Sequence, residues 1–168
     1  MINYIYYPNN DTIPQHLIDI VNAFKVLEKD ISSEKHTLSS DDVLSKFVKP
    51  FKDLGYNIET GKRKEDKISI PILYGVNGKI VKKFEADAYN QTLETVVEIE
   101  AGRGVLNNQF LKDYFEACMM LNVQYCVIAV RNIYGKTKDF EYVKNFFDAL
   151  YTSRRITTCL KGLLIIGY

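Results

Sequence analysis

Two apolar runs in the last third of the chain constrain the fold most strongly. The stretches VQYCVIAV (123–130) and LKGLLIIGY (160–168) are almost continuously apolar, as in strands that are covered on both faces. A helical pattern, DFEYVKNFFDALY (139–151), separates them. A strand, a helix and a second strand in this order predict parallel neighbours in a sheet that has helices on both faces.

Antiparallel strands are expected earlier in the chain. Asn77-Gly78 is a strong hairpin signal between two strand-like runs, and Pro71 in the first run indicates an edge strand. Ser39 and Asp42 resemble a capping box that opens a helix, in which Pro50 predicts a kink or a break. The remaining elements are expected as helices at 14–29, 39–54 and 107–121 and strands at 56–60, 68–74, 79–89 and 93–101.

The sequence therefore predicts an α/β fold with a mixed central β-sheet flanked by helices. Its length of 168 residues fits one domain, 1–168, with an N-terminal helical segment at about 11–54 and the sheet core at about 56–168. Three cysteines, widely spaced in apolar runs, argue against a disulfide framework and favour the cytoplasm. No apolar stretch approaches the roughly 18 residues that span a membrane, so no membrane partner is expected.

Carboxylates stand where a strand should bury apolar side chains. In the run LETVVEIEA, Glu98 and Glu100 point the same way because side chains alternate along a strand. Asp87 ends the preceding strand-like run, so two neighbouring strands can present their acids together. Carboxylates roughly 6 to 7 Å apart repel by about 2 kcal/mol at an effective dielectric near 20. Either a raised pKa or a shared divalent cation relieves this repulsion.

The same alternation also describes a strand with one face in water. Two features favour the shared cation. The helix and the apolar strand that follow predict a central position in the sheet for this strand, and basic residues cluster nearby in the sequence. Hard oxygen ligands of this kind suit Mg²⁺, which can polarise a phosphodiester and lower the pKa of a bound water.

The element order and these acids resemble the PD-(D/E)xK nucleases, which have the restriction-endonuclease-like fold. The resemblance covers roughly residues 40 to 130, with Ala86-Asp87 in the PD place and Glu98-Ile99-Glu100 in the (D/E)xK place. It implies that Asp87 and Glu98 bind one or two Mg²⁺ ions in a catalytic set completed by Glu100. It also implies double-stranded DNA as substrate and a homodimer as the form that cuts both strands.

The chain departs from the family pattern at two positions. Ala86 replaces the proline, and Glu100 replaces the lysine. A similar Glu-x-Glu occurs in some restriction enzymes, where the second glutamate is taken as the general base. The other interpretations are an inactive descendant that only binds, or a lysine supplied from elsewhere, with Lys82 and Lys83 nearest in sequence. For the acid that many of these nucleases add from a helix, the candidates are Glu28, Asp41 and Asp42.

Basic and amide side chains surround the acidic strands in sequence. A net charge of only +1 means that any phosphate-binding surface must come from such local clustering. A charged run is also typical of an ordinary solvated face, and the two asparagines also suit a helix cap. The predicted nucleic-acid-binding residues are Lys62, Arg63, Lys64, Lys82, Lys83, Arg103, Asn107 and Asn108.

The sequence thus predicts a Mg²⁺-dependent DNA endonuclease of the restriction-enzyme type. The alternative is a catalytically inactive protein of the same fold that binds nucleic acid or a protein partner. A third interpretation is a small metabolic α/β protein whose acids form a salt-bridge network.

Overall fold

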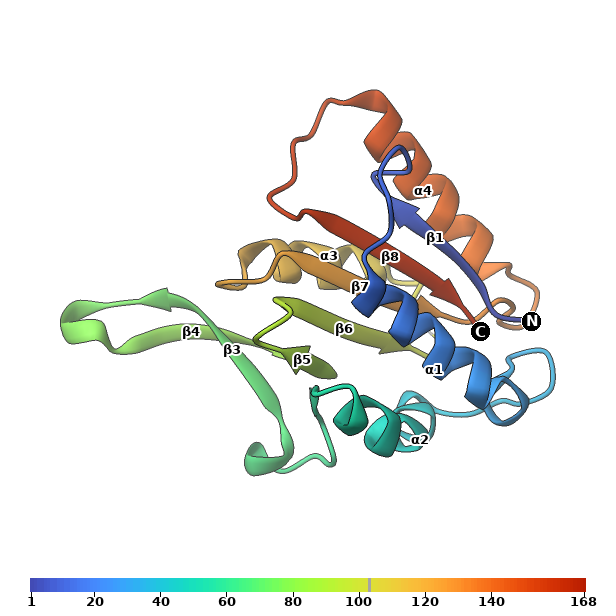
Figure 1. Ribbon diagram of the computed structural model, residues 1–168, viewed down its shortest axis with the longest axis horizontal. Helices are drawn as coiled ribbons and strands as arrows, with labels where there is room; N and C mark the ends of the chain where they lie inside the picture. Colours follow the sequence, from blue (N-terminus) through green and yellow to red (C-terminus); the bar gives the residue numbers. More distant parts are fainter. Residues whose placement is uncertain (103) are drawn as a thin grey trace.

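The computed structural model describes residues 1–168 with the exception of Arg103. Figure 1 shows a central sheet with helices against it and a long hairpin that projects from one side. The helices are α1 (Gln15–Ile31), α2 (Ser40–Asp53), α3 (Gln109–Met119) and α4 (Asp139–Ser153), with short 3₁₀ turns at Lys64–Asp66 and Val76–Gly78. The strands are β1 (Asn3–Tyr7), β2 (Asn57–Ile58), β3 (Ile68–Tyr74), β4 (Ile80–Ala86), β5 (Ala88–Asn90), β6 (Thr95–Glu100), β7 (Tyr125–Val130) and β8 (Gly162–Gly167).

The central sheet is mixed, as the sequence predicts. Its strand order is β1-β8-β7-β6-β5-β2. The pairs β2–β5 and β5–β6 are antiparallel, whereas β6, β7 and β8 run parallel to one another. The first strand, β1, joins the sheet antiparallel to β8, so the sheet extends beyond the predicted core at 56–168.

Two helical layers cover the two faces of the sheet. Residues of α1 and α2 form one apolar core with Val97, Ile99 and Val127. Residues of α3 and α4 form a second core with Val96 and Ile128 on the opposite face. Because side chains alternate along a strand, Glu98 and Glu100 lie on the α3 side of β6. This placement brings a helix directly against the two glutamates.

The capping box at the start of α2 is confirmed. The Ser39 hydroxyl accepts a hydrogen bond from the backbone N–H of Asp42, and the Asp42 carboxylate accepts one from the backbone N–H of Ser39. The expected break at Pro50 is not found, because α2 continues to Asp53. Only one backbone hydrogen bond is lost at a helical proline, and Phe47 and Phe51, both fully buried, hold the last turns against the core.

The hairpin around Asn77-Gly78 is confirmed as well, but it does not join the central sheet. Asn77 and Gly78 have φ values of 58° and 70°, the left-handed conformation that this turn requires. Strands β3 and β4 pair only with each other and form a separate two-stranded sheet. Among the described residues, no helix has both the length and the apolar character needed to cross a membrane.

Candidate functional site

The backbone register brings the predicted acids together. Ala88 pairs with Val97 across β5 and β6, and the same register continued by one residue sets Asp87 opposite Glu98. The Asp87 carboxylate also accepts a hydrogen bond from the backbone N–H of Ile99 at 2.7 Å, which fixes its position beside β6. The two carboxylates therefore lie close together, but Asp87 stands in the bend between β4 and β5 and not on a strand, as the sequence had predicted.

These side chains line an open cleft of about 260 Å³, here called the acidic cleft. Eight of its lining residues are acids and two are lysines. The lining residues are Ser40, Asp41, Glu59, Lys67, Glu85, Ala86, Asp87, Glu98, Ile99, Glu100, Gln109, Lys112, Asp113 and Glu116. They come from α2, the end of β2, the roots of the hairpin, β6 and α3, so the cleft exists only in the folded chain.

Asp113 on α3 is the acid that sequence reasoning missed. It lies on the buried face of the helix, with only 5% of its surface exposed, between Phe110 and Tyr114. Gln109 donates a hydrogen bond to its Oδ1 at 2.9 Å, whereas its buried Oδ2 has no hydrogen-bond partner among the described residues. The available signal was the position of Asp113 three residues after Phe110 and four before Ala117, on an otherwise apolar face.

The helix acids considered from the sequence have other roles. Asp41 lines the acidic cleft, but it is exposed and its carboxylate is 2.9 Å from the Lys62 ammonium. Asp42 belongs to the capping box of α2. Glu28 lies 3.1 Å from the N-terminal ammonium of Met1 and is not part of the cleft lining.

Burial and mutual repulsion raise the pKa values of the acids in the cleft. Burial raises the pKa of Asp87 to about 7, with further contributions from Glu59 and Asp113. Burial and the nearby Asp113 raise the pKa of Glu100 to about 8. Burial also raises the pKa of Asp113 to about 6 and that of Glu98 well above its usual value. In the metal-free protein, bound protons therefore relieve the repulsion.

The carboxylate oxygens of the acidic cleft suit a hard cation. In their observed positions, however, these side chains do not surround an ion. Among the residues that the structure describes, no three His, Cys, Asp or Glu side chains form a group that could hold a metal ion. The unpartnered Oδ2 of Asp113 and the proton-binding carboxylates beside it are nevertheless the oxygen ligands that Mg²⁺ takes. Binding an ion here requires side-chain rotation from the observed positions.

The two cleft lysines are not those nearest in sequence to the acids. Lys67 lies 2.6 Å from Glu59 and is half-buried, and Lys112 lies 3.2 Å from Glu116 and 3.9 Å from Asp113. Lys82 and Lys83, by contrast, lie on the exposed hairpin, where Lys83 donates to Ser69 and Lys82 sits over the Phe84 ring. The lysines that line the acidic cleft are therefore Lys67 and Lys112.

The predicted nucleic-acid-binding residues come from separate segments of the chain. Lys62, Arg63 and Lys64 are exposed in the segment after β2, and Arg103 lies outside the described residues. Asn108 occupies the N-cap position of α3 in the left-handed conformation, but its side chain makes no capping hydrogen bond. Asn107 beside it is exposed. Asn108 therefore occupies the predicted cap position, but its side chain does not cap the helix.

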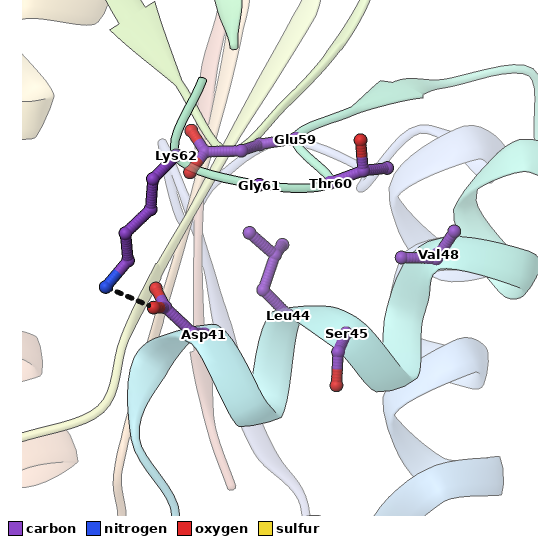
Figure 2. Close-up of a pocket in the computed structure, with 8 residues that line it drawn as sticks. All are labelled: Asp41, Leu44, Ser45, Val48, Glu59, Thr60, Gly61 and Lys62. Atoms are coloured by element: carbon purple, nitrogen blue, oxygen red, sulfur yellow. Dashed lines mark ion pairs between the residues drawn. The ribbon is translucent and has the colours of Figure 1, made fainter. Parts of the chain in front are cut away.

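A second hollow of about 250 Å³ lies between α2 and residues 59–62 and shares Asp41 and Glu59 with the acidic cleft. Figure 2 shows the Lys62–Asp41 ion pair beside it and the Leu44 side chain directed toward the 59–62 segment. Its lining is mainly apolar on the α2 side, through Leu44 and Val48. The ion pair holds Lys62 close to the acidic cleft.

Comparison with protein families, with curated proteins and with solved structures finds no match to this chain. The fold and the acidic cleft are thus the basis for any statement about function.

Proposed function

We propose that this protein is a divalent-cation-dependent DNA endonuclease of the PD-(D/E)xK type. One observation carries the proposal: Asp87, directly before β5, and Glu98 on β6 line one cleft, which they share with Glu100 and Asp113. Burying four acids, partly or fully, in one cleft costs folding free energy. Acids in such an arrangement are typical of functional sites.

The topology around the cleft supports the resemblance. Along the chain, α2 is followed by β2, the β3–β4 hairpin, β5, β6, α3 and β7. With the hairpin set aside, this order is similar to that of the nuclease family. Asp87 stands between β4 and β5, and Glu98 and Glu100 lie on β6, which is similar to the arrangement of the acids in the family.

Asp87 and Glu98 would hold Mg²⁺, and Asp113 would add an oxygen ligand through its unpartnered Oδ2. When bound, the cation would polarise the phosphodiester and lower the pKa of an attacking water. Lys67 and Lys112 line the same cleft, and their ammonium groups can contact phosphate oxygens.

Glu100 would handle the proton of the attacking water. Its pKa of about 8 lies close to neutral pH, where a carboxyl group both accepts and releases a proton readily. Its position two residues after Glu98 keeps it on the same face of β6, within the acidic cleft.

Isosteric substitutions test the proposal. Asp87→Asn and Glu98→Gln should reduce Mg²⁺-dependent nicking of supercoiled plasmid by at least about a hundredfold, because each removes an anionic ligand worth several kcal/mol to the transition state. Asp30→Asn, an exposed position on α1, is the matched control and should nick like the parent. Titration calorimetry with Mg²⁺ alone should show binding to the parent and weakened binding to the two cleft variants.

A second candidate is a DNA-binding protein of this fold without catalysis. Glu100 in the place of the family lysine and the absence, among the described residues, of a ready three-ligand group favour it. A parent protein that binds duplex DNA but cuts none with Mg²⁺ or Mn²⁺ would establish this second function in place of the first.

Cutting both strands calls for two active sites, so the endonuclease proposal includes a homodimer. Sedimentation analysis checks this oligomeric state.

A further inference from the structure

The hairpin of β3 and β4 has an exposed outer part, whose exposure the packing of the core does not explain. Figure 1 shows it projecting from the body of the molecule, away from α1 and α4. Every residue from Leu73 to Lys83 is exposed. We call this segment, residues 73–83, the basic arm.

The basic arm combines positive charge with apolar surface. It contains Lys79, Lys82 and Lys83 and no acidic residue. Its exposed apolar side chains include Val76 at 82%, Val81 at 62% and Ile80 at 54% exposure. An apolar surface of this kind, kept in water on a projecting hairpin, is typical of an interaction site rather than of a fold-stabilising element.

The hairpin that carries the basic arm begins and ends at the acidic cleft. Strand β4 ends at Ala86, immediately before Asp87, and β3 begins at Ile68, immediately after the cleft residue Lys67. A polyanion whose phosphate reached the cleft would therefore run close to the arm. The three lysines give that arm the charge that a phosphate backbone attracts.

The dimensions of the arm favour duplex DNA over duplex RNA as its ligand. A two-stranded ribbon fits the major groove of B-form DNA, which is about 12 Å wide, but not the deep and narrow major groove of an A-form RNA helix. The arm takes four residues from β4, which at about 3.3 Å per residue give a ribbon about 13 Å long. Register shifts at Pro71, Leu73 and Tyr74 increase the twist of the ribbon, which suits a helical groove.

We propose that the basic arm enters the major groove of duplex DNA beside the acidic cleft, with its lysines on phosphates and its apolar side chains against base edges. This inference rests on the proposed function for its substrate class and adds the element that engages the duplex. It assigns Lys82 and Lys83 to the arm rather than to the catalytic site.

The test measures binding of the full-length protein to a fluorescent 30-base-pair duplex in EDTA, where no cleavage occurs, over a range of salt concentrations. The triple variant Lys79→Gln, Lys82→Gln, Lys83→Gln should bind at least about tenfold more weakly. The slope of log K against log salt should become less steep by about 0.9 for each lost phosphate contact. The matched control replaces three exposed lysines at the other end of the molecule, Lys25, Lys29 and Lys35, and should keep the parental slope.

A second variant tests the apolar side chains. Val76→Ser, Ile80→Ser and Val81→Ser together should weaken duplex binding and leave the mass in sedimentation unchanged. If these changes instead dissociate a parental dimer while duplex binding is kept, the arm contacts a second copy of the chain and the proposal is wrong. Equal salt slopes for the parent and the lysine variant would also overturn it, even if the parent cuts DNA. A parent that binds through the arm without cutting would support the arm and reject the endonuclease.

Discussion

Asp113 changes the electrostatics of the whole cleft, although it is one residue on α3. Burial and the nearby Asp113 raise the pKa of Glu100, which keeps Glu100 protonated up to about pH 8. Asp113 adds a further carboxyl group to a cleft that already holds Glu98 and Glu100. The charge of these acids must be neutralised by protons or by a cation.

The raised pKa values predict how stability depends on pH. An acid whose pKa is higher in the folded than in the unfolded state stabilises the fold only at low pH, and the benefit is lost as the pH rises through the folded value. For Asp87, Glu100 and Asp113, that loss runs from about pH 4 to about pH 8. In EDTA, the free energy of unfolding from urea titrations should therefore fall over this window, by at most about 1.4 kcal/mol per pH unit for each proton retained by the folded state.

Asp113→Asn removes one of these charges and should make the decline with pH shallower. Millimolar Mg²⁺ should do the same for the parent, because a bound cation replaces the protons. A stability that rises between pH 5 and 8 in EDTA would contradict the electrostatic account of the cleft.

At the level of elements, α2 supports the site without supplying its central acids. The Ser40 hydroxyl accepts a hydrogen bond from the backbone N–H of Ala101 at 3.0 Å, directly after β6. The next residue, Asp41, lines the cleft and pairs with Lys62. The first turn of α2 is thus tied to the end of the strand that carries both glutamates, and the Ser39–Asp42 capping box fixes where that turn begins.

Removing the cap should have a measurable cost. Ser39→Ala deletes the acceptor for the Asp42 N–H and should lower the free energy of unfolding by about 1 kcal/mol. Ser45→Ala is the control, because its hydroxyl donates to the backbone carbonyl of Asp42 inside the same helix and its loss should be nearly neutral. Equal effects of the two changes in urea denaturation would show that the box does not stabilise α2.

At the scale of the whole molecule, one aromatic cluster joins elements from both ends of the chain. Phe147 on α4 packs against Tyr7 of β1 and against Phe110 and Tyr114 of α3, with ring centroids 5.0 to 6.1 Å apart. Phe110 and Tyr114 flank Asp113 in the sequence, so the cluster also fixes the helix face that presents this acid. Phe147 itself is fully buried.

Phe147→Ala should therefore lower the free energy of unfolding by about 3–5 kcal/mol, the usual cost of emptying a buried aromatic site. Phe146→Ala is the matched control, because the neighbouring ring is 37% exposed and its loss leaves no comparable cavity. Thermal or urea denaturation of the two variants distinguishes them. A Phe146→Ala variant as unstable as Phe147→Ala would contradict the placement of this core.

The sequence by itself determined the features that depend on short-range patterns or on the alternation of side chains along a strand. The mixed sheet, the capping box at Ser39, the Asn77-Gly78 hairpin and the shared face of Glu98 and Glu100 all follow from such patterns. Even the approach of Asp87 to Glu98 could be predicted, because only a short connection separates their strands.

Only the tertiary structure decided which distant residues meet. Tyr4 of β1 pairs with Ile166 of β8, and Asp113 faces Glu100, through contacts that no local pattern encodes. The helical spacing could indicate that Asp113 is buried, but not that it lies near Glu100. The hairpin separates from the central sheet because β5, rather than β4, pairs with β6. Such choices depend on how whole layers pack, and packing is a property of the assembled chain.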